Sequence, residues 1–93
     1  MYARVATFES DASKVDDAIA TVRSAVDGET PPGLEGAKML MLVDRESGGM
    51  IGVTLFESEE GMRRGDEAMN AGQGHAGSRS AVEFYEVPLH TLG

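Results

Sequence analysis

Cysteine and tryptophan are both missing from this chain of 93 residues. Without cysteine, the protein has no disulfide framework, no thiolate-bound zinc or iron–sulfur cluster, and no thiol nucleophile. Basic residues are scarce, because eight Lys and Arg stand against sixteen Asp and Glu, giving a formal net charge of −8. An acidic surface repels phosphate backbones and anionic lipids. We therefore expect neither nucleic acid nor a membrane surface as a partner.

Long hydrophobic runs are also missing, and none reaches the length of a membrane span. A strand pattern that begins at Tyr2 leaves no room for a signal peptide. The sequence therefore predicts an acidic, soluble, cytoplasmic protein. Its length predicts a single domain, residues 1–93, and a domain this small buries a limited fraction of its surface by itself.

Alternating apolar residues and one helical stripe mark most of the elements. The alternation predicts strands over residues 2–8, 37–44, 50–57 and 81–87. Between the first two strands, apolar residues recur at helical spacing and predict a helix: Val15, Ala18, Ile19, Val22, Ala25 and Val26. Ser13 and Asp16 resemble a capping box at its start, and Gly28 suits a left-handed cap at its end.

A second helix is predicted after Ser58, a good N-cap, with Glu59 and Glu60 favouring its positive end. This helix carries a stripe of small residues, Gly61, Gly65, Ala68 and Gly72. Small residues let a helix approach a sheet closely, which is the favoured interpretation, but they could also leave room for a flat ligand. Four methionines fit either interpretation, first as adaptable core residues and second as pocket lining: Met39, Met41, Met62 and Met69.

The predicted order strand-helix-strand-strand-helix-strand is that of the ferredoxin-like α+β fold, βαββαβ, with a four-stranded antiparallel sheet and two helices on one face. The other face would still carry apolar side chains on several strands. An apolar patch of this kind usually marks an association surface. We therefore expect a homodimer in which two sheets pack face to face, a dimeric α/β barrel.

Three stretches carry a family resemblance: the opening "MYARVATFES", the hairpin "LMLVDRESGGMIGVTLFESEE" and the closing "AVEFYEV". Together they resemble the dimeric α/β-barrel superfamily, close to the antibiotic-biosynthesis-monooxygenase-like domains. The resemblance implies the ferredoxin-like fold, the dimer, and a cleft between the helices and the sheet.

The resemblance also implies site residues that this sequence replaces. Heme-degrading relatives use a first-strand asparagine, a tryptophan and a late-helix histidine that ligates iron, and quinone-forming monooxygenases use an asparagine and a tryptophan. Here Thr7 occupies the first-strand position, no tryptophan is present, and the single asparagine is Asn70. His75 lies in the region of the iron-ligating histidine.

These departures favour a non-catalytic or small-ligand-binding module with no cofactor. One alternative is a cofactor-independent monooxygenase acting on a flat aromatic or quinone-like substrate. Another is heme binding or degradation through His75. The polar groups we expect near a small aromatic ligand are Thr7, Thr54, His75 and Tyr85. A lone histidine at a glycine-rich helix end is more often only solvent-exposed.

The remaining charged and glycine-rich motifs have structural interpretations. Arg4 and Glu83 could form an ion pair across neighbouring strands, and "RRGDE" at 63–67 fits a solvated helical face with charge pairing along the helix. Residues 72–77 match GxGxxG but follow a helix, whereas a dinucleotide site needs this motif after a strand. No metal-ligand spacing is present.

Overall fold

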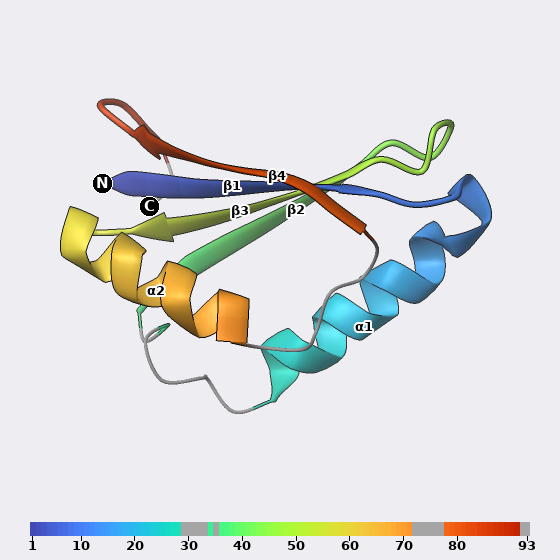
Figure 1. Cartoon of the computed structure of the whole chain (residues 1–93), viewed down its shortest axis with the longest axis horizontal. Coiled ribbons are helices and arrows are strands. Elements are labelled where there is room, and N and C mark those ends of the chain that lie inside the picture. The colour runs from blue at the N-terminus through green and yellow to red at the C-terminus, as the bar shows by residue number, and fades with distance from the viewer. Residues whose placement is uncertain (29–33, 35, 72–77, 92–93) are drawn as a thin grey trace.

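The protein forms one antiparallel sheet with both helices on the same side (Figure 1). The computed structural model describes residues 1–28, 34, 36–71 and 78–91. In chain order the elements are β1 (Tyr2–Glu9), a short 3₁₀ turn (Ala12–Lys14), α1 (Val15–Asp27), β2 (Lys38–Val43), β3 (Met50–Phe56), α2 (Glu59–Ala71) and β4 (Ser78–Glu86). The strands lie in the order β2-β3-β1-β4. The predicted ferredoxin-like βαββαβ fold is therefore confirmed, and β4 begins three residues earlier than expected.

Strand register assigns every side chain to one of two faces. Arg4 of β1 lies beside Thr54 of β3 and Phe84 of β4, and its side chain reaches α2. We call this side the helix face. Because side chains alternate along a strand, Val5 and its neighbours Val53 and Glu83 point the other way, to a side we call the open face.

The core lies mainly between α2 and the two central strands. Ala6, Met50 and Phe56 of the helix face are buried, and so is Met62 of α2. A Cβ atom on Gly65 would overlap the ring of Phe56. The small residue at this position is thus required for close packing, which confirms the favoured interpretation of the stripe at Gly65.

The two helices begin in different ways. Ser58 caps α2 as predicted, because its hydroxyl accepts a hydrogen bond from the Gly61 N–H at 2.9 Å. α1 has no side-chain cap, so the predicted Ser13–Asp16 capping box is wrong. The 3₁₀ turn over 12–14 contains Ser13 and delays the start of α1 to Val15, which removes Ser13 from the capping position.

The end of α1 also differs from the prediction. Gly28 has φ −81°, which is not the left-handed conformation expected of it. The chain leaves the helix along an extended path instead, while the Gly28 N–H still donates to the carbonyl of Ser24 at 3.2 Å. No helix in the described part of the chain is both long and apolar enough to cross a membrane.

The β2–β3 hairpin closes through a turn built on Asp44. Its carboxylate accepts hydrogen bonds from the backbone N–H of Glu46 at 2.9 Å and of Ser47 at 3.4 Å. Gly48 has φ +83°, and a Cβ atom there would overlap the carbonyl of Ser10. The hairpin tip is therefore packed against the connection between β1 and α1.

Candidate functional site

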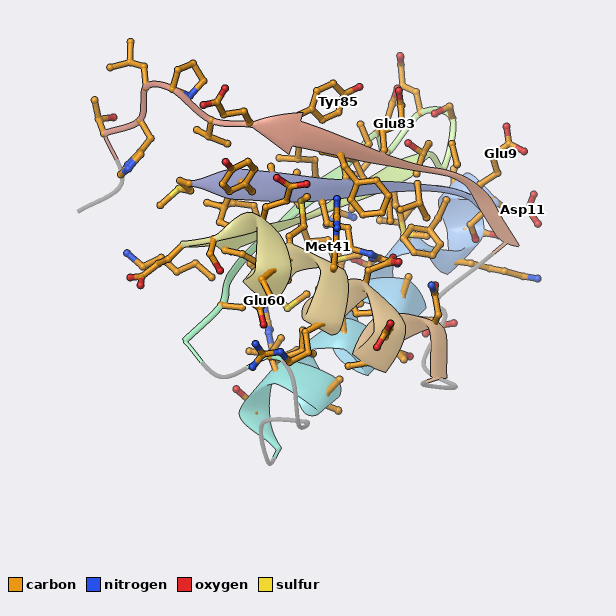
Figure 2. All side chains as sticks on the ribbon, turned by 60° about the vertical axis from the view of Figure 1, so that its left-hand side comes forward. Glu9, Asp11, Met41, Glu60, Glu83 and Tyr85 are labelled. Carbon is orange, nitrogen blue, oxygen red and sulfur yellow. The ribbon has the colours of Figure 1, made fainter. Side chains whose placement is uncertain are left out.

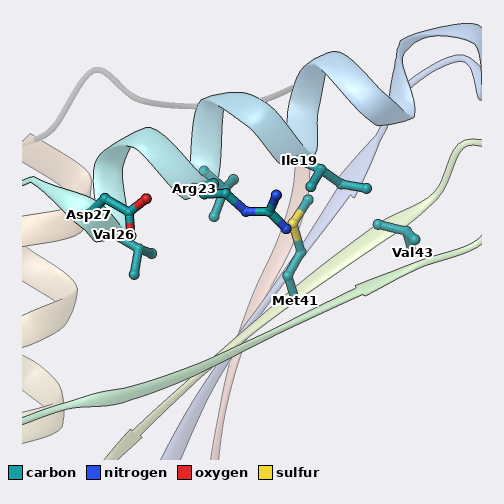
Figure 3. A pocket seen from close by; sticks show the side chains of 7 residues that line it. Ile19, Arg23, Val26, Asp27, Met41 and Val43 are labelled. Atoms are coloured by element: carbon teal, nitrogen blue, oxygen red, sulfur yellow. The ribbon is translucent and has the colours of Figure 1, made fainter.

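A groove of about 410 Å³ separates α1 from the edge strand β2, and it is open to solvent (Figure 3). Five apolar side chains line it: Ile19, Val22 and Val26 from α1, and Met41 and Val43 from β2. Arg23 and Asp27 are the charged residues of the lining. The groove joins residues that are far apart in sequence, which is why no local motif marks it.

The groove exists because α1 is anchored at one end only. Val15 and Ala18, near its start, are buried at 1% and 5% exposure. Val26, near its end, is 57% exposed although it belongs to the same apolar stripe. The C-terminal half of α1 thus presents apolar side chains toward β2 without filling the space between them.

The two charged lining residues are not paired with each other. Arg23 and Asp27 are four residues apart on α1, the spacing at which Arg63–Glu59 and Arg64–Glu60 form ion pairs on α2, at 2.6 and 3.1 Å. With the residues that the structure describes, neither Arg23 nor Asp27 forms an ion pair. Figure 3 shows the Arg23 side chain extending toward Met41. A guanidinium group is therefore available beside an apolar surface.

Two ionisable groups with shifted pKa values lie away from the groove. The Tyr85 hydroxyl donates a hydrogen bond to the Glu83 carboxylate at 2.9 Å, and this bond raises the pKa of Tyr85. Both residues are on the open face, on the side of the sheet away from Met41 (Figure 2). In the hairpin turn, the hydrogen bonds from the backbone of Glu46 and Ser47 lower the pKa of Asp44.

The structure does not gather the four predicted ligand-binding residues into one site. Thr54 is buried on the helix face, where its hydroxyl lies 4.0 Å from the sulfur of Met69. Thr7 and Tyr85 are on the open face, so the sheet separates them from Thr54. His75 is outside the described residues.

Arg4 has a different partner from the one predicted. Its Nε donates to the Asp66 carboxylate at 2.7 Å, and its Nη2 lies 3.5 Å from the Asn70 side-chain oxygen. The predicted Arg4–Glu83 ion pair is wrong, because Glu83 lies opposite Val5 and points to the open face. The predicted charge pairing along the helix is confirmed for Arg63 and Arg64, which pair with Glu59 and Glu60. Asp66 instead turns toward the sheet and pairs with Arg4.

Sequence reasoning missed the groove residues as a site. The apolar positions of α1 were expected to be core, and nothing drew attention to Arg23 or Asp27. Met41 was considered as pocket lining only as the second choice after core. The one sequence feature that could have indicated the groove is an arginine directly beside the apolar stripe of α1. This feature by itself is weak evidence for a binding site. Among the described residues, no group of three or more His, Asp or Glu is placed to hold a metal ion.

Comparisons with known proteins support the fold. No family model matches the sequence, and no curated protein matches it. A crystal structure from Chloroflexus aurantiacus J-10-fl, described as a putative antibiotic biosynthesis monooxygenase, aligns over 99% of this chain and 98% of that chain, with a TM-score of 0.64 and 13% sequence identity. The chain thus belongs to the class of small ferredoxin-like α+β proteins. Within that class, it shares the fold of an antibiotic-biosynthesis-monooxygenase-like protein over almost its whole length, as its sequence resemblance predicted.

Proposed function

We propose that this protein is a non-catalytic module that binds a small, largely apolar molecule in the groove between α1 and β2. The observation that carries the proposal is the groove itself, whose volume is about 410 Å³ and whose lining is apolar apart from Arg23 and Asp27. Small-molecule sites typically measure about 300–1,000 Å³ and combine apolar walls with a few polar groups. The groove has both properties.

The driving force for binding would be removal of apolar surface from water. Val26 is more than half exposed, and Met41 is only partly buried. Covering such surface stabilises a complex by roughly 25 cal/mol per Å². Because the groove is open, a ligand keeps part of its own surface in water, so we expect micromolar rather than nanomolar affinity.

Binding without catalysis is supported by the chemistry of the groups present. General acid–base catalysis needs a matched acid and base within reach of the substrate. Asp44 and Tyr85, whose pKa values are shifted, lie outside the groove. Asn70 of α2 accepts a hydrogen bond from Arg4 and donates one to Asp66, which is a structural role.

A cofactor-independent monooxygenase is the second candidate, favoured by the name of the structural neighbour from Chloroflexus aurantiacus. Its substrate would be a flat aromatic or quinone-like molecule in the same groove. Oxygen uptake with a panel of anthrols and hydroquinones, above the rate without protein, would establish this activity. Heme binding through His75 is a third proposal, and it requires a Soret shift that His75→Ala abolishes.

A homodimer formed through the open face is also part of the proposal. Large apolar side chains remain exposed there on three strands: Leu40, Leu42, Ile51 and Tyr85. Leu42 lies directly opposite Ile51 in the β2–β3 register, and Leu40 is the next residue of β2 on the same face, so these three side chains form a continuous patch. Such a patch on a small protein usually marks an association surface, and a second copy presents a matching one.

The binding proposal can be tested by NMR with methionine ε-methyl groups labelled with ¹³C. We expect the neutral flat aromatic 2-naphthamide to shift the methyl signal of Met41, which lines the groove, and to leave that of buried Met62 unchanged. Val22→Trp would fill the groove and abolish the shift. Ala20→Trp, on the exposed side of α1, is the matched control and should bind normally.

Two outcomes would contradict the binding proposal. The first is that neither 2-naphthamide nor the corresponding carboxylate, 2-naphthoate, shifts the methyl signal of Met41. The other is binding that Val22→Trp leaves unchanged. Circular dichroism of both tryptophan variants checks that each remains folded.

A further inference from the structure

We infer that Arg23 makes the groove selective for molecules that carry one carboxylate on an apolar body. The inference rests on the proposed binding function and deepens it by naming the ligand class. It starts from the one positively charged side chain of the lining, which meets five apolar neighbours and no acidic partner among the described residues.

The lack of an acidic partner for Arg23 among the described residues contrasts with four other arginines. Arg4, Arg45, Arg63 and Arg64 each contact a carboxylate at 2.6 to 3.1 Å. Acidic residues outnumber basic ones by sixteen to eight, so partners are plentiful. Arg23 nevertheless has no acidic partner at the groove within the part of the chain that the structure describes. An unpaired guanidinium beside apolar walls is complementary to a ligand with an anionic head and an apolar body.

The position of Arg23 along the groove sets how such a ligand would lie. Arg23 is one turn beyond Ile19 on α1, and its side chain extends toward Met41 of β2 (Figure 3). The apolar body would rest between Ile19, Met41 and Val43. The carboxylate would then meet the guanidinium, whose planar N–H groups fit both carboxylate oxygens at once.

Asp27 limits the charge that the groove accepts. It lines the groove one helical turn from Arg23, near Val26. A second negative charge on the ligand would meet Asp27 without a cation to offset it. The net charge of −8 adds long-range repulsion of the same sign. The groove therefore favours a monocarboxylate over a dicarboxylate or a phosphate ester.

The test compares two ligands of the same shape, 2-naphthoate and its neutral amide, 2-naphthamide, by titration of the wild-type protein at low salt. We expect the carboxylate to bind about three- to tenfold more tightly, the range of a partly exposed charged hydrogen bond. Arg23→Gln should remove this preference, so that this variant binds the two ligands with equal affinity. Arg23→Lys, which keeps the charge, should retain part of it.

Two further variants separate the role of Arg23 from a general charge effect. Arg45→Gln removes an exposed arginine from the hairpin, outside the groove lining, and should leave the preference intact. Asp27→Asn removes the nearby negative charge and should strengthen binding of 2-naphthoate two- to threefold. Thermal melts of all variants confirm that each is folded.

The outcomes distinguish this inference from the binding proposal. If wild-type protein binds both ligands equally, or if Arg23→Gln keeps the preference, the inference is wrong and the groove remains a binding site. If neither ligand shifts Met41, the binding proposal fails and the inference fails with it. If Arg45→Gln weakens the preference as much as Arg23→Gln, the selectivity comes from net charge, which also overturns the inference.

Discussion

At the scale of single residues, the buried guanidinium of Arg4 carries the largest energetic consequence. Arg4 is 4% exposed, and its donors meet the carboxylate of Asp66, the sulfur of Met69 and the amide oxygen of Asn70. A buried charge is tolerated only when it is paired and hydrogen-bonded. This cluster therefore joins β1 to one side of α2 and restricts how the helix can sit on the sheet.

Removing the partner of Arg4 should destabilise the protein. We expect Asp66→Ala to lower the free energy of unfolding by about 2–4 kcal/mol, because it leaves the guanidinium buried and unpaired. Glu67→Ala, an exposed neighbour on α2, should change it by less than about 0.5 kcal/mol. Urea denaturation measures both. The double variant Arg4→Met, Asp66→Ala should regain part of the loss, and a cost for Asp66→Ala no larger than that for Glu67→Ala would contradict this assignment.

Asp44 predicts a pH dependence of stability. Hydrogen bonds from the backbone of Glu46 and Ser47 hold the pKa of Asp44 below its usual value in the folded protein. A folded-state pKa below the unfolded one contributes stability above the unfolded pKa, and this contribution is lost as the pH falls through the folded pKa. Asp44→Asn should therefore melt at a lower temperature than wild type near neutral pH.

The difference between Asp44→Asn and wild type should vanish once the carboxyl is protonated. Thermal melts from neutral pH down to acid measure this convergence. Glu46→Gln changes the charge of the same turn but keeps the Asp44 carboxylate that accepts the backbone hydrogen bonds. This control variant should not show a pH-dependent difference from wild type. A constant gap between Asp44→Asn and wild type at every pH would disprove the role of the ionised carboxylate.

At the scale of elements, the two helices contact the sheet in opposite ways. α2 lies close, because Gly65 leaves room for the ring of Phe56 and Met62 is buried beside it. α1 is anchored near Val15 and leaves a groove beside β2 at its other half. The same sheet face thus carries a tightly packed side and a side with space for a ligand.

The close approach of α2 predicts the effect of enlarging Gly65. Alanine favours a helix by about 1 kcal/mol over glycine, but its Cβ atom would overlap the Phe56 ring and approach Leu34 to 3.2 Å. We expect overpacking to exceed the helix gain, with Gly65→Ala losing about 1–2 kcal/mol of unfolding free energy. In a Phe56→Leu background the ring is absent, so Gly65→Ala should lower the free energy of unfolding by less. An equal or larger loss in that background would contradict the packing argument.

At the scale of the whole molecule, the open face carries exposed large apolar side chains on three strands. Leu42 is 50% exposed and adjoins Ile51 and Leu40 on the same face. Tyr85 and Glu83 lie on this face too, paired through their side chains. A second copy packed there would cover the leucines and place the Tyr85–Glu83 pair at the interface.

The proposed dimer predicts a change in sedimentation. We expect wild-type protein to sediment as a dimer at micromolar concentration and Leu42→Glu to sediment as a folded monomer, because a charge in an apolar interface has no partner. Leu89→Glu makes the same substitution at an exposed position outside the sheet and should remain dimeric. A wild-type protein that is monomeric and folded at these concentrations would rule out the dimer.

Most of the fold could be predicted from the sequence, because its elements depend on local periodicity and on residues with strong positional preferences. Ser58 caps α2, and strand alternation correctly separates Arg4 from Val5. The errors at Ser13 and Gly28 are also local, and arise because a 3₁₀ turn and an extended exit compete closely with the expected caps. The site could not be predicted, because Arg23 and Met41 meet only after the chain has folded.

The amino-acid sequence by itself determined the order of strands and helices and the two apolar faces of the sheet. Only the tertiary structure decided that Arg4 pairs with Asp66, and that α1 leaves a groove beside β2. The physical reason is the distance along the chain over which each interaction acts. Periodicity and capping act between residues a few positions apart, whereas ion-pair choice and unfilled volume depend on how whole elements pack against one another.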